Sequence, residues 1–161
     1  MKKNTGNAYL GFLILVMLVL PLVSVLTEAA LNADAPFTIE PAGKWFLFWG
    51  IGMRLLIAGL RQALNPVFTA RDIFNITDVA SHALVRELGF SNICLGLPGV
   101  VSLFFPHWRL AAACAGGLYM GIAGIQHVFK KPTGSNEITA MISDLFIFLL
   151  MAAYVLTAVL C

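Results

Sequence analysis

Five apolar stretches, each long enough to cross a lipid bilayer, follow one another along this chain of 161 residues. A transmembrane helix needs roughly 20 consecutive and mainly apolar residues. Such stretches occupy residues 9–31, 45–64, 83–105, 110–129 and 139–160. Because 60% of the residues are hydrophobic and only 11% are charged, too little polar surface is left to solvate a globule. The sequence therefore predicts a single all-α integral-membrane domain over residues 1–161, a polytopic helical bundle of five spans.

The first stretch follows Lys2 and Lys3, as the apolar core of a secretory signal peptide would. A signal core usually has about 7–15 apolar residues, and this stretch is longer. We therefore expect residues 9–31 to form the first membrane-spanning helix. Pro21 lies inside it, where proline removes one backbone hydrogen bond, so we expect a kink there.

Lysine and arginine residues are distributed unevenly between the two sides of the predicted bundle. With the N-terminus in the cytoplasm, the second and fourth connections are cytoplasmic too, and cations favour that side. The cations then on the inside are Lys2, Lys3, Arg61, Arg71, Arg86, Lys130 and Lys131. Those on the outside are Lys44 and Arg109, and the outer helix ends also carry Trp45, Trp49 and Trp108. We expect a multi-pass protein of the inner (plasma) membrane, with the N-terminus cytoplasmic and the C-terminus outside.

A short polar connection joins the second and third spans. It begins with an Asn-Pro pair, which is typical of a helix cap and a first helical position. We expect a short interfacial helix over residues 66–74, with Phe68 and Phe74 among the cytoplasmic headgroups and Arg71 and Asp72 facing water. The plainer alternative is a membrane-surface connector without further function.

Several polar side chains lie inside the predicted spans, where an uncompensated charge at the bilayer centre costs at least about 2.5–3.5 kcal/mol. Arg54 lies seven residues before Arg61, which at 1.5 Å per residue is about 10 Å from the cytoplasmic edge. The same reasoning places all of the intramembrane polar residues in the cytoplasmic half. These residues are Arg54, Glu87, Asn92, Gln126, His127 and Asp144. We expect them to face the bundle interior and to form a polar site.

Arg54 is the natural counter-ion in this group, because a guanidinium stays charged and its planar fork suits a carboxylate. We predict that Arg54 pairs with Asp144 or with Glu87, and that Asn92 and His127 complete a hydrogen-bonded pocket. These five residues are the candidates for ligand binding or ion relay. Two alternatives stay open: Glu87 and His127 are near enough to the interface to reach headgroups, and Arg54 and Asp144 would also serve as a purely structural pair.

Small residues recur every four positions in the fourth span, at Ala113, Gly117 and Gly121. Such a stripe lets two helices approach closely, and we expect an interface inside the bundle rather than between two copies. The third span contains Gly-Leu-Pro-Gly at residues 96–99. This sequence is compatible with a packing kink or with an unwound, ligand-coordinating segment of the kind found in transporters.

The motifs of familiar soluble enzymes are missing from the sequence. Cys94, Cys114 and Cys161 have no metal-ligand spacing, and there is no P-loop, dinucleotide fingerprint, nucleophile elbow or haem-attachment motif. No run of basic residues indicates nucleic-acid binding. We therefore expect no disulfide, no metal, no catalytic residues and no nucleic-acid partner, and an enzyme is the less favoured class.

One segment carries a resemblance to known proteins. Residues 86–96 contain Glu-x-Gly-Phe-x-Asn, a glycine-rich helix then ends in His127, and the last helix carries Asn136 and then Asp144. Over residues 45–160 this order resembles a small bacterial membrane-protein family of uncharacterised function and, more remotely, DoxX-type helical bundles. The resemblance implies a bacterial inner-membrane protein with a compact four-helix unit to which the first helix is an addition. It singles out Glu87, Asn92, His127 and Asp144. Some DoxX-like relatives act beside quinone-linked redox enzymes, although this chain lacks a cysteine pair for such chemistry.

Two classes of function fit these observations. The leading one is binding or permeation of a proton, cation or small polar solute, because membrane carboxylates and histidines such as Glu87, Asp144 and His127 are common relay groups. The second is an accessory subunit of a larger membrane complex whose pocket holds a lipid, a quinone or a partner helix. A membrane enzyme is a weaker third class. We expect membrane lipids as partners, within a homo-oligomer or a larger complex, and no cofactor other than a bound lipid or quinone.

Overall fold

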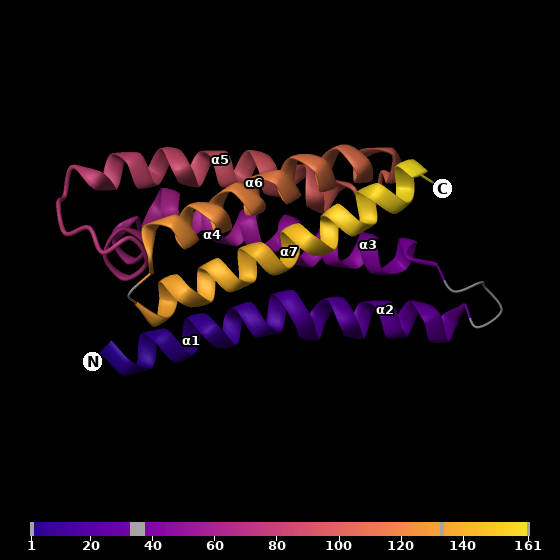
Figure 1. The fold of residues 1–161 in the computed structure, drawn as a ribbon, viewed down its shortest axis with the longest axis horizontal. Coiled ribbons are helices and arrows are strands. Elements are labelled where there is room, and N and C mark those ends of the chain that lie inside the picture. The colour runs from indigo at the N-terminus through magenta and orange to yellow at the C-terminus, as the bar shows by residue number, and fades with distance from the viewer. Residues whose placement is uncertain (1, 33–37, 133, 161) are drawn as a thin grey trace.

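The computed structural model describes residues 2–32, 38–132 and 134–160. Within these ranges the chain consists of helices and their connections and contains no strand. The long helices lie side by side, and the two chain termini lie at opposite ends of the bundle (Figure 1). The all-α bundle predicted from the sequence is confirmed.

Five helical units make up the described chain. The first consists of α1 (Lys2–Ile14), the π-helical segment η1 (Leu15–Val19) and α2 (Leu20–Leu31). The second consists of α3 (Glu40–Phe46), the π-helical segment η2 (Leu47–Met53) and α4 (Arg54–Leu64). After the short π-helical segment η3 (Thr69–Ile73) come α5 (Ser81–Val101), the 3₁₀ turn η4 (Pro106–Trp108) with α6 (Arg109–Lys130), and α7 (Ser135–Leu160). All five units are long and apolar enough to cross a membrane, as predicted.

Several helix ends differ from the predicted ones. The first unit begins at Lys2 rather than at residue 9, and the fifth begins at Ser135 rather than at residue 139. The second unit starts at Glu40 rather than at residue 45, because Pro41 occupies its first turn, where the missing N–H of proline has no helical partner to lose. The third unit ends at Val101 rather than at residue 105. There Ser102 Oγ donates to the carbonyl oxygen of Gly99 at 2.7 Å, and the next residues form a turn.

The helices α6 and α7 pack closely along the stripe of small residues. Ala113, Gly117 and Gly121 are buried. A Cβ atom added to Gly117 would lie 3.0 Å from Cβ of Met151, and one added to Gly121 would lie 2.5 Å from Cδ2 of Phe148. Both neighbours belong to α7, so the stripe forms an interface within the chain, as expected.

The helix α5 approaches α4 and the preceding η2 even more closely, because glycines face each other across this interface. A Cβ added to Gly59 would lie 2.6 Å from the carbonyl oxygen of Gly89, and one added to Gly96 would lie 2.8 Å from that of Gly52. The helix α5 continues without a break through residues 96–99. The unwound alternative is therefore wrong, and Gly96 and Gly99 pack against Gly52.

The two halves of the bundle differ in what fills their centre. We call the half with α1, the ends of α4 and α6 and the starts of α5 and α7 the proximal half, and the opposite half the distal half. The centre of the distal half is filled by Leu47, Ile51, Ile147 and Met151, none of which is more than 1% exposed. Its middle is therefore a packed apolar core, whereas the proximal half contains polar groups and a cavity.

The segment around η3 closes the proximal end of the bundle. It contacts α5 and α7, and it buries Thr69, Ala70 and Ile73. The helix predicted over residues 66–74 is therefore present in shortened form. Phe68 and Phe74 are half-buried and line the cavity, because the segment folds against the helix ends.

Candidate functional site

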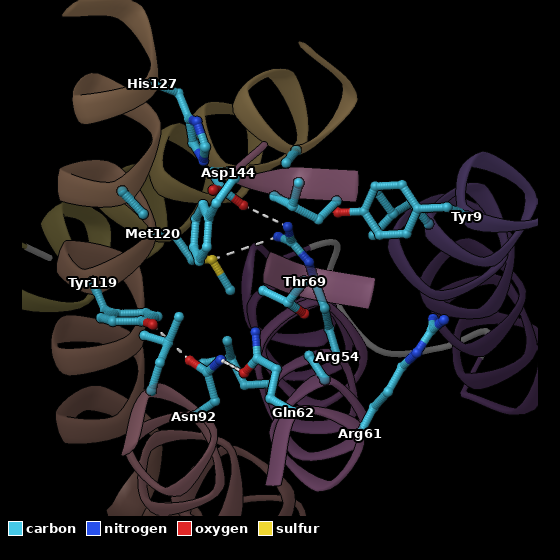
Figure 2. A pocket seen from close by; sticks show the side chains of 18 of the residues that line it. Tyr9, Arg54, Arg61, Gln62, Thr69, Asn92, Tyr119, Met120, His127 and Asp144 are labelled. Carbon is cyan, nitrogen blue, oxygen red and sulfur yellow. Dashed lines mark hydrogen bonds and ion pairs between the residues drawn. The ribbon is translucent and has the colours of Figure 1, made fainter. Parts of the chain in front are cut away.

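A cavity of about 630 Å³ lies in the proximal half of the bundle. Its walls come from α1, α4, the segment around η3, α5, α6 and α7, and most of its lining side chains are apolar. Figure 2 shows the polar side chains that reach into it from several helices. Four of the five residues predicted as site candidates line this cavity, and these are Arg54, Asn92, His127 and Asp144.

Arg54 and Asp144 form a buried ion pair on one wall of the cavity. Nη2 of Arg54 donates to Oδ1 of Asp144 and, at 2.9 Å, to Oγ of Ser143. Nη1 of Arg54 lies 3.5 Å from the sulfur of Met120, which is a weak acceptor. Of the two partners predicted for Arg54, the structure has Asp144. The pair satisfies the principle that a charge within a membrane protein must find a partner.

The π-helical segment η2 ends immediately before Arg54. A π-helical turn holds more residues than an α-helical turn, so it rotates the side chains that follow it relative to those before it. Gly50 and Gly52 are buried within η2, where they let other helices approach closely. This local change of helix type turns Arg54 toward α7 and the cavity, and such insertions are frequent at functional sites.

A second polar group links three helices by hydrogen bonds. The hydroxyl of Tyr119 donates to Oδ1 of Asn92 at 2.6 Å, and Nδ2 of Asn92 donates to Oε1 of Gln62 at 2.6 Å (Figure 2). Asn92 is 4% exposed and Gln62 is 8% exposed. Because Oε1 of Gln62 accepts the bond from Asn92, this series of hydrogen bonds ends at the amide nitrogen of Gln62. The N–H groups of that amide lie at the cavity wall.

His127 lies at the end of α6 and faces the start of α7. Its Nδ1 lies 3.6 Å from Oε1 of Glu137, and Nζ of Lys130 lies 3.8 Å from the same oxygen. Glu137 is only 3% exposed. His127 therefore lies with Glu137 and Lys130 at the rim of the cavity, rather than in the hydrogen-bonded group of Asn92 that we had predicted.

Arg61 borders the cavity on the side of α1. Its guanidinium carbon lies 3.8 Å from the ring centre of Phe68, whose ring centre lies 5.8 Å from that of Tyr9. The same three residues also line a smaller cavity of about 140 Å³ next to the first. The hydroxyl of Tyr9 points toward Arg54 (Figure 2).

Glu87 is the one predicted candidate that does not reach the site. It is exposed on α5 and does not line the cavity. Five residues separate it from Asn92, which corresponds to about 140° around a helix of 3.6 residues per turn. The buried face of α5 contains Val85, Gly89 and Asn92, so Glu87 lies on the far side of the helix.

Sequence reasoning missed Gln62, Tyr119, Tyr9 and Arg61 as members of the site. Gln62 is a polar residue near the end of a span, and Arg61 is one of the cations used to assign topology. Arg61 was explained by the cytoplasmic interface, and Gln62 was assigned no role. Tyr9 opens the first span, where an aromatic residue is usually an interface anchor. Tyr119 lies in the middle of the fourth span, where an aromatic residue usually packs in the core.

Comparison with curated proteins and with solved structures gave no match. The model of one protein family, described as a family of unknown function (DUF6790), matches residues 11–161. This range contains four of the five units that are long and apolar enough to cross a membrane, and most of the first. Because the match covers nearly the whole chain, the protein belongs to DUF6790, a family of unknown function.

Proposed function

We propose that this protein binds an amphipathic, lipid-like molecule in the cavity of the proximal half, as an accessory or lipid-binding component of the membrane. The cavity of about 630 Å³ falls in the range of small-molecule sites, which is roughly 300–1,000 Å³. Its mainly apolar lining with a few convergent polar groups is also typical of such sites. Such a site suits a molecule with a long apolar part and a small polar part.

The observation that carries this proposal is the kind of polar group the cavity presents. Among the described lining residues, Asp144 is the only carboxylate, and Arg54 already neutralises it. Nη1 of Arg54 lies against a thioether sulfur, which is a weak acceptor, and the Arg54 side chain also interacts with the hydroxyl of Tyr9. Gln62 also presents amide N–H groups. Hydrogen-bond donors with poor or no acceptors favour a ligand that carries oxygen acceptors, such as a carbonyl, carboxylate or phosphate.

Permeation of a proton or cation is the second candidate, and the contact of His127 with Glu137 at the proximal rim favours it. A complete route would also have to cross the distal half. Ten residues of α7, about 15 Å of helix, separate Asp144 from Tyr154, and Ile147 and Met151 fill that interval. A packed apolar core resists the passage of charge, so the geometry supports binding better than permeation.

We also propose that the proximal half faces the cytoplasm of a bacterial cell, with the N-terminus inside and the C-terminus outside the plasma membrane. More cations belong to the proximal end than to the distal end, and positive charge favours the cytoplasm. The proximal cations among the described side chains are Arg61, Arg71, Arg86, Lys130 and Lys131. The distal ones are Lys44 and Arg109. The bacterial assignment rests on the resemblance to bacterial and DoxX-type bundles described above.

The proposal is tested by filling the cavity. Ala123 lines the cavity, whereas Ala115, two turns earlier on α6, is exposed and does not. The wild type, Ala123→Phe and the matched control Ala115→Phe would be purified in a mild neutral detergent. Native mass spectrometry, followed by extraction and mass analysis of the released molecules, would then identify what each variant retains.

We expect the wild type and Ala115→Phe to retain the same amphipathic molecule and Ala123→Phe to lose most of it. Equal retention by all three folded proteins would contradict binding in this cavity. A proton or cation flux in protein-containing liposomes, well above that of empty liposomes, would instead support the second candidate.

A further inference from the structure

We propose that the ligand of the cavity is an anionic amphiphile, whose carboxylate or phosphate head binds Arg61 while its hydrocarbon part occupies the cavity. This inference rests on the proposed function and names the chemical class of the ligand.

The first support is the charge balance of the cavity. Its described lining contains the cations Arg54, Arg61 and Lys130 and the single carboxylate of Asp144. Asp144 neutralises Arg54, and Lys130 lies 3.8 Å from Glu137. None of the ion pairs formed between the described residues involves Arg61. One positive charge is therefore left over at the edge of an apolar cavity, and an anion would balance it.

The second support is the geometry of Arg61. Its guanidinium lies over the ring of Phe68 at 3.8 Å, and stacking of this kind holds the planar group in place. The edges of the guanidinium keep their N–H donors, whose fork matches the two oxygens of a carboxylate or phosphate. Arg61 thus combines an oriented donor set with the unbalanced charge.

The third support is the position of Arg61 between apolar spaces. Arg61, Tyr9, Phe12 and Phe68 line both the main cavity and the adjacent one of about 140 Å³. Arg61 is exposed and lies three residues before the end of α4, the level at which lipid headgroups would lie. A free inorganic anion would gain only the contact with Arg61. An amphiphile would gain the burial of its hydrocarbon part as well, which is favourable in proportion to the apolar area removed from water.

The experiment compares ligands that share one tail and differ in the head. Oleate carries a carboxylate, oleoyl lysophosphatidic acid carries a phosphate, and monoolein carries neither charge. Sodium acetate and inorganic phosphate supply the head chemistry without a tail. Binding to the full-length protein in neutral detergent would be measured by competition against a fluorescent fatty acid. The variants are Arg61→Gln, Arg61→Lys and, as a matched control, Arg71→Gln, since Arg71 is an exposed cation that does not line the cavity.

We expect one or both anionic amphiphiles to bind the wild type about tenfold more tightly than monoolein, since a hydrogen bond to a charged group contributes on this scale. Arg61→Gln should reduce this preference to about twofold or less, Arg61→Lys should keep part of it, and Arg71→Gln should keep all of it. The relative affinities of oleate and the lysophosphatidic acid would show which head is preferred. Acetate and phosphate should not compete.

Two results would overturn the inference while leaving the proposed function intact. One is equal affinity for oleate, the lysophosphatidic acid and monoolein in the wild type, and the other is an unchanged anion preference in Arg61→Gln. Competition by acetate or phosphate alone would replace the amphiphile with a free anion. If no amphiphile binds and Ala123→Phe behaves like the wild type, the proposed function fails together with this inference.

Discussion

The guanidinium of Arg54 is bonded to the carboxylate of Asp144, 90 residues later in the chain, and neither side chain is more than 9% exposed. The pair joins the second helical unit to the last one, at the wall of the cavity. Removing one member of a buried pair leaves an uncompensated charge, whereas removing both members leaves no buried charge.

We therefore expect Arg54→Met and Asp144→Leu each to lower the free energy of unfolding by about 3–5 kcal/mol. The double variant Arg54→Met/Asp144→Leu should recover most of this loss, because no charge remains buried without a partner. Reversible unfolding in detergent, followed by circular dichroism, measures the three effects. A double variant as unstable as the sum of the single ones would show that the two charges do not depend on each other.

The hydrogen-bonded group of Tyr119, Asn92 and Gln62 should contribute separately to stability. Asn92→Leu leaves the hydroxyl of Tyr119 and the oxygen of Gln62 without their partner, and we expect a loss of about 1–3 kcal/mol. Ser91→Ala is the control, because Ser91 is exposed next to Asn92 on α5. Its effect should stay within about 0.5 kcal/mol. Equal effects of the two substitutions on the unfolding midpoint would argue against a role for this group.

The close contact of α4 and α5 predicts opposite effects for two Gly→Ala substitutions. Gly59→Ala places a Cβ 2.6 Å from the carbonyl oxygen of Gly89, which cannot move without shifting the helix. We expect a loss of about 1–3 kcal/mol from this overpacking. At Gly11 of α1 nothing lies within 4 Å of the added Cβ, so Gly11→Ala should instead stabilise by about 0.5–1 kcal/mol. Thermal unfolding of both variants checks the sign of each effect, and two losses of similar size would contradict the close helix contact.

Glu87 should be dispensable, because it is exposed on α5 away from the cavity. We expect Glu87→Gln to change the free energy of unfolding by no more than about 0.5 kcal/mol and to leave ligand retention unchanged. Loss of the bound molecule in a stably folded Glu87→Gln protein would show that Glu87 contributes to binding and that the ligand lies outside this cavity.

The proposed orientation predicts the fate of reporters at the C-terminus. With five spans and a cytoplasmic N-terminus, the C-terminus lies outside, where green fluorescent protein exported in unfolded form stays dark and alkaline phosphatase is active. Replacing the proximal cations Arg61, Arg71 and Arg86 with glutamine should raise the fraction of inverted molecules. A fluorescent and phosphatase-inactive C-terminus in the wild-type chain would reverse the orientation.

The sequence by itself determined the fold class, the number of helical units and the level of most site residues along the helices. These properties follow from local features, namely the length of each apolar run and the fixed rise of a helix per residue. The stripe at Ala113, Gly117 and Gly121 also has a local signature, and its internal packing followed from it.

Only the tertiary structure decided which polar groups meet. The sequence did not distinguish Glu87 from Asp144 as the partner of Arg54. In the structure, the rotation of the helices places Glu87 on the surface and Asp144 beside the guanidinium. The rotation of Arg54 itself follows a π-helical segment that apolar periodicity does not reveal. Likewise Gln62 joins the site because Asn92 of α5 donates to it, and Arg61 joins it because Phe68, just before η3, lies against its guanidinium. Depth in a bundle is a property of one helix, whereas contact depends on the relative rotation and packing of several helices, which no single stretch of sequence contains.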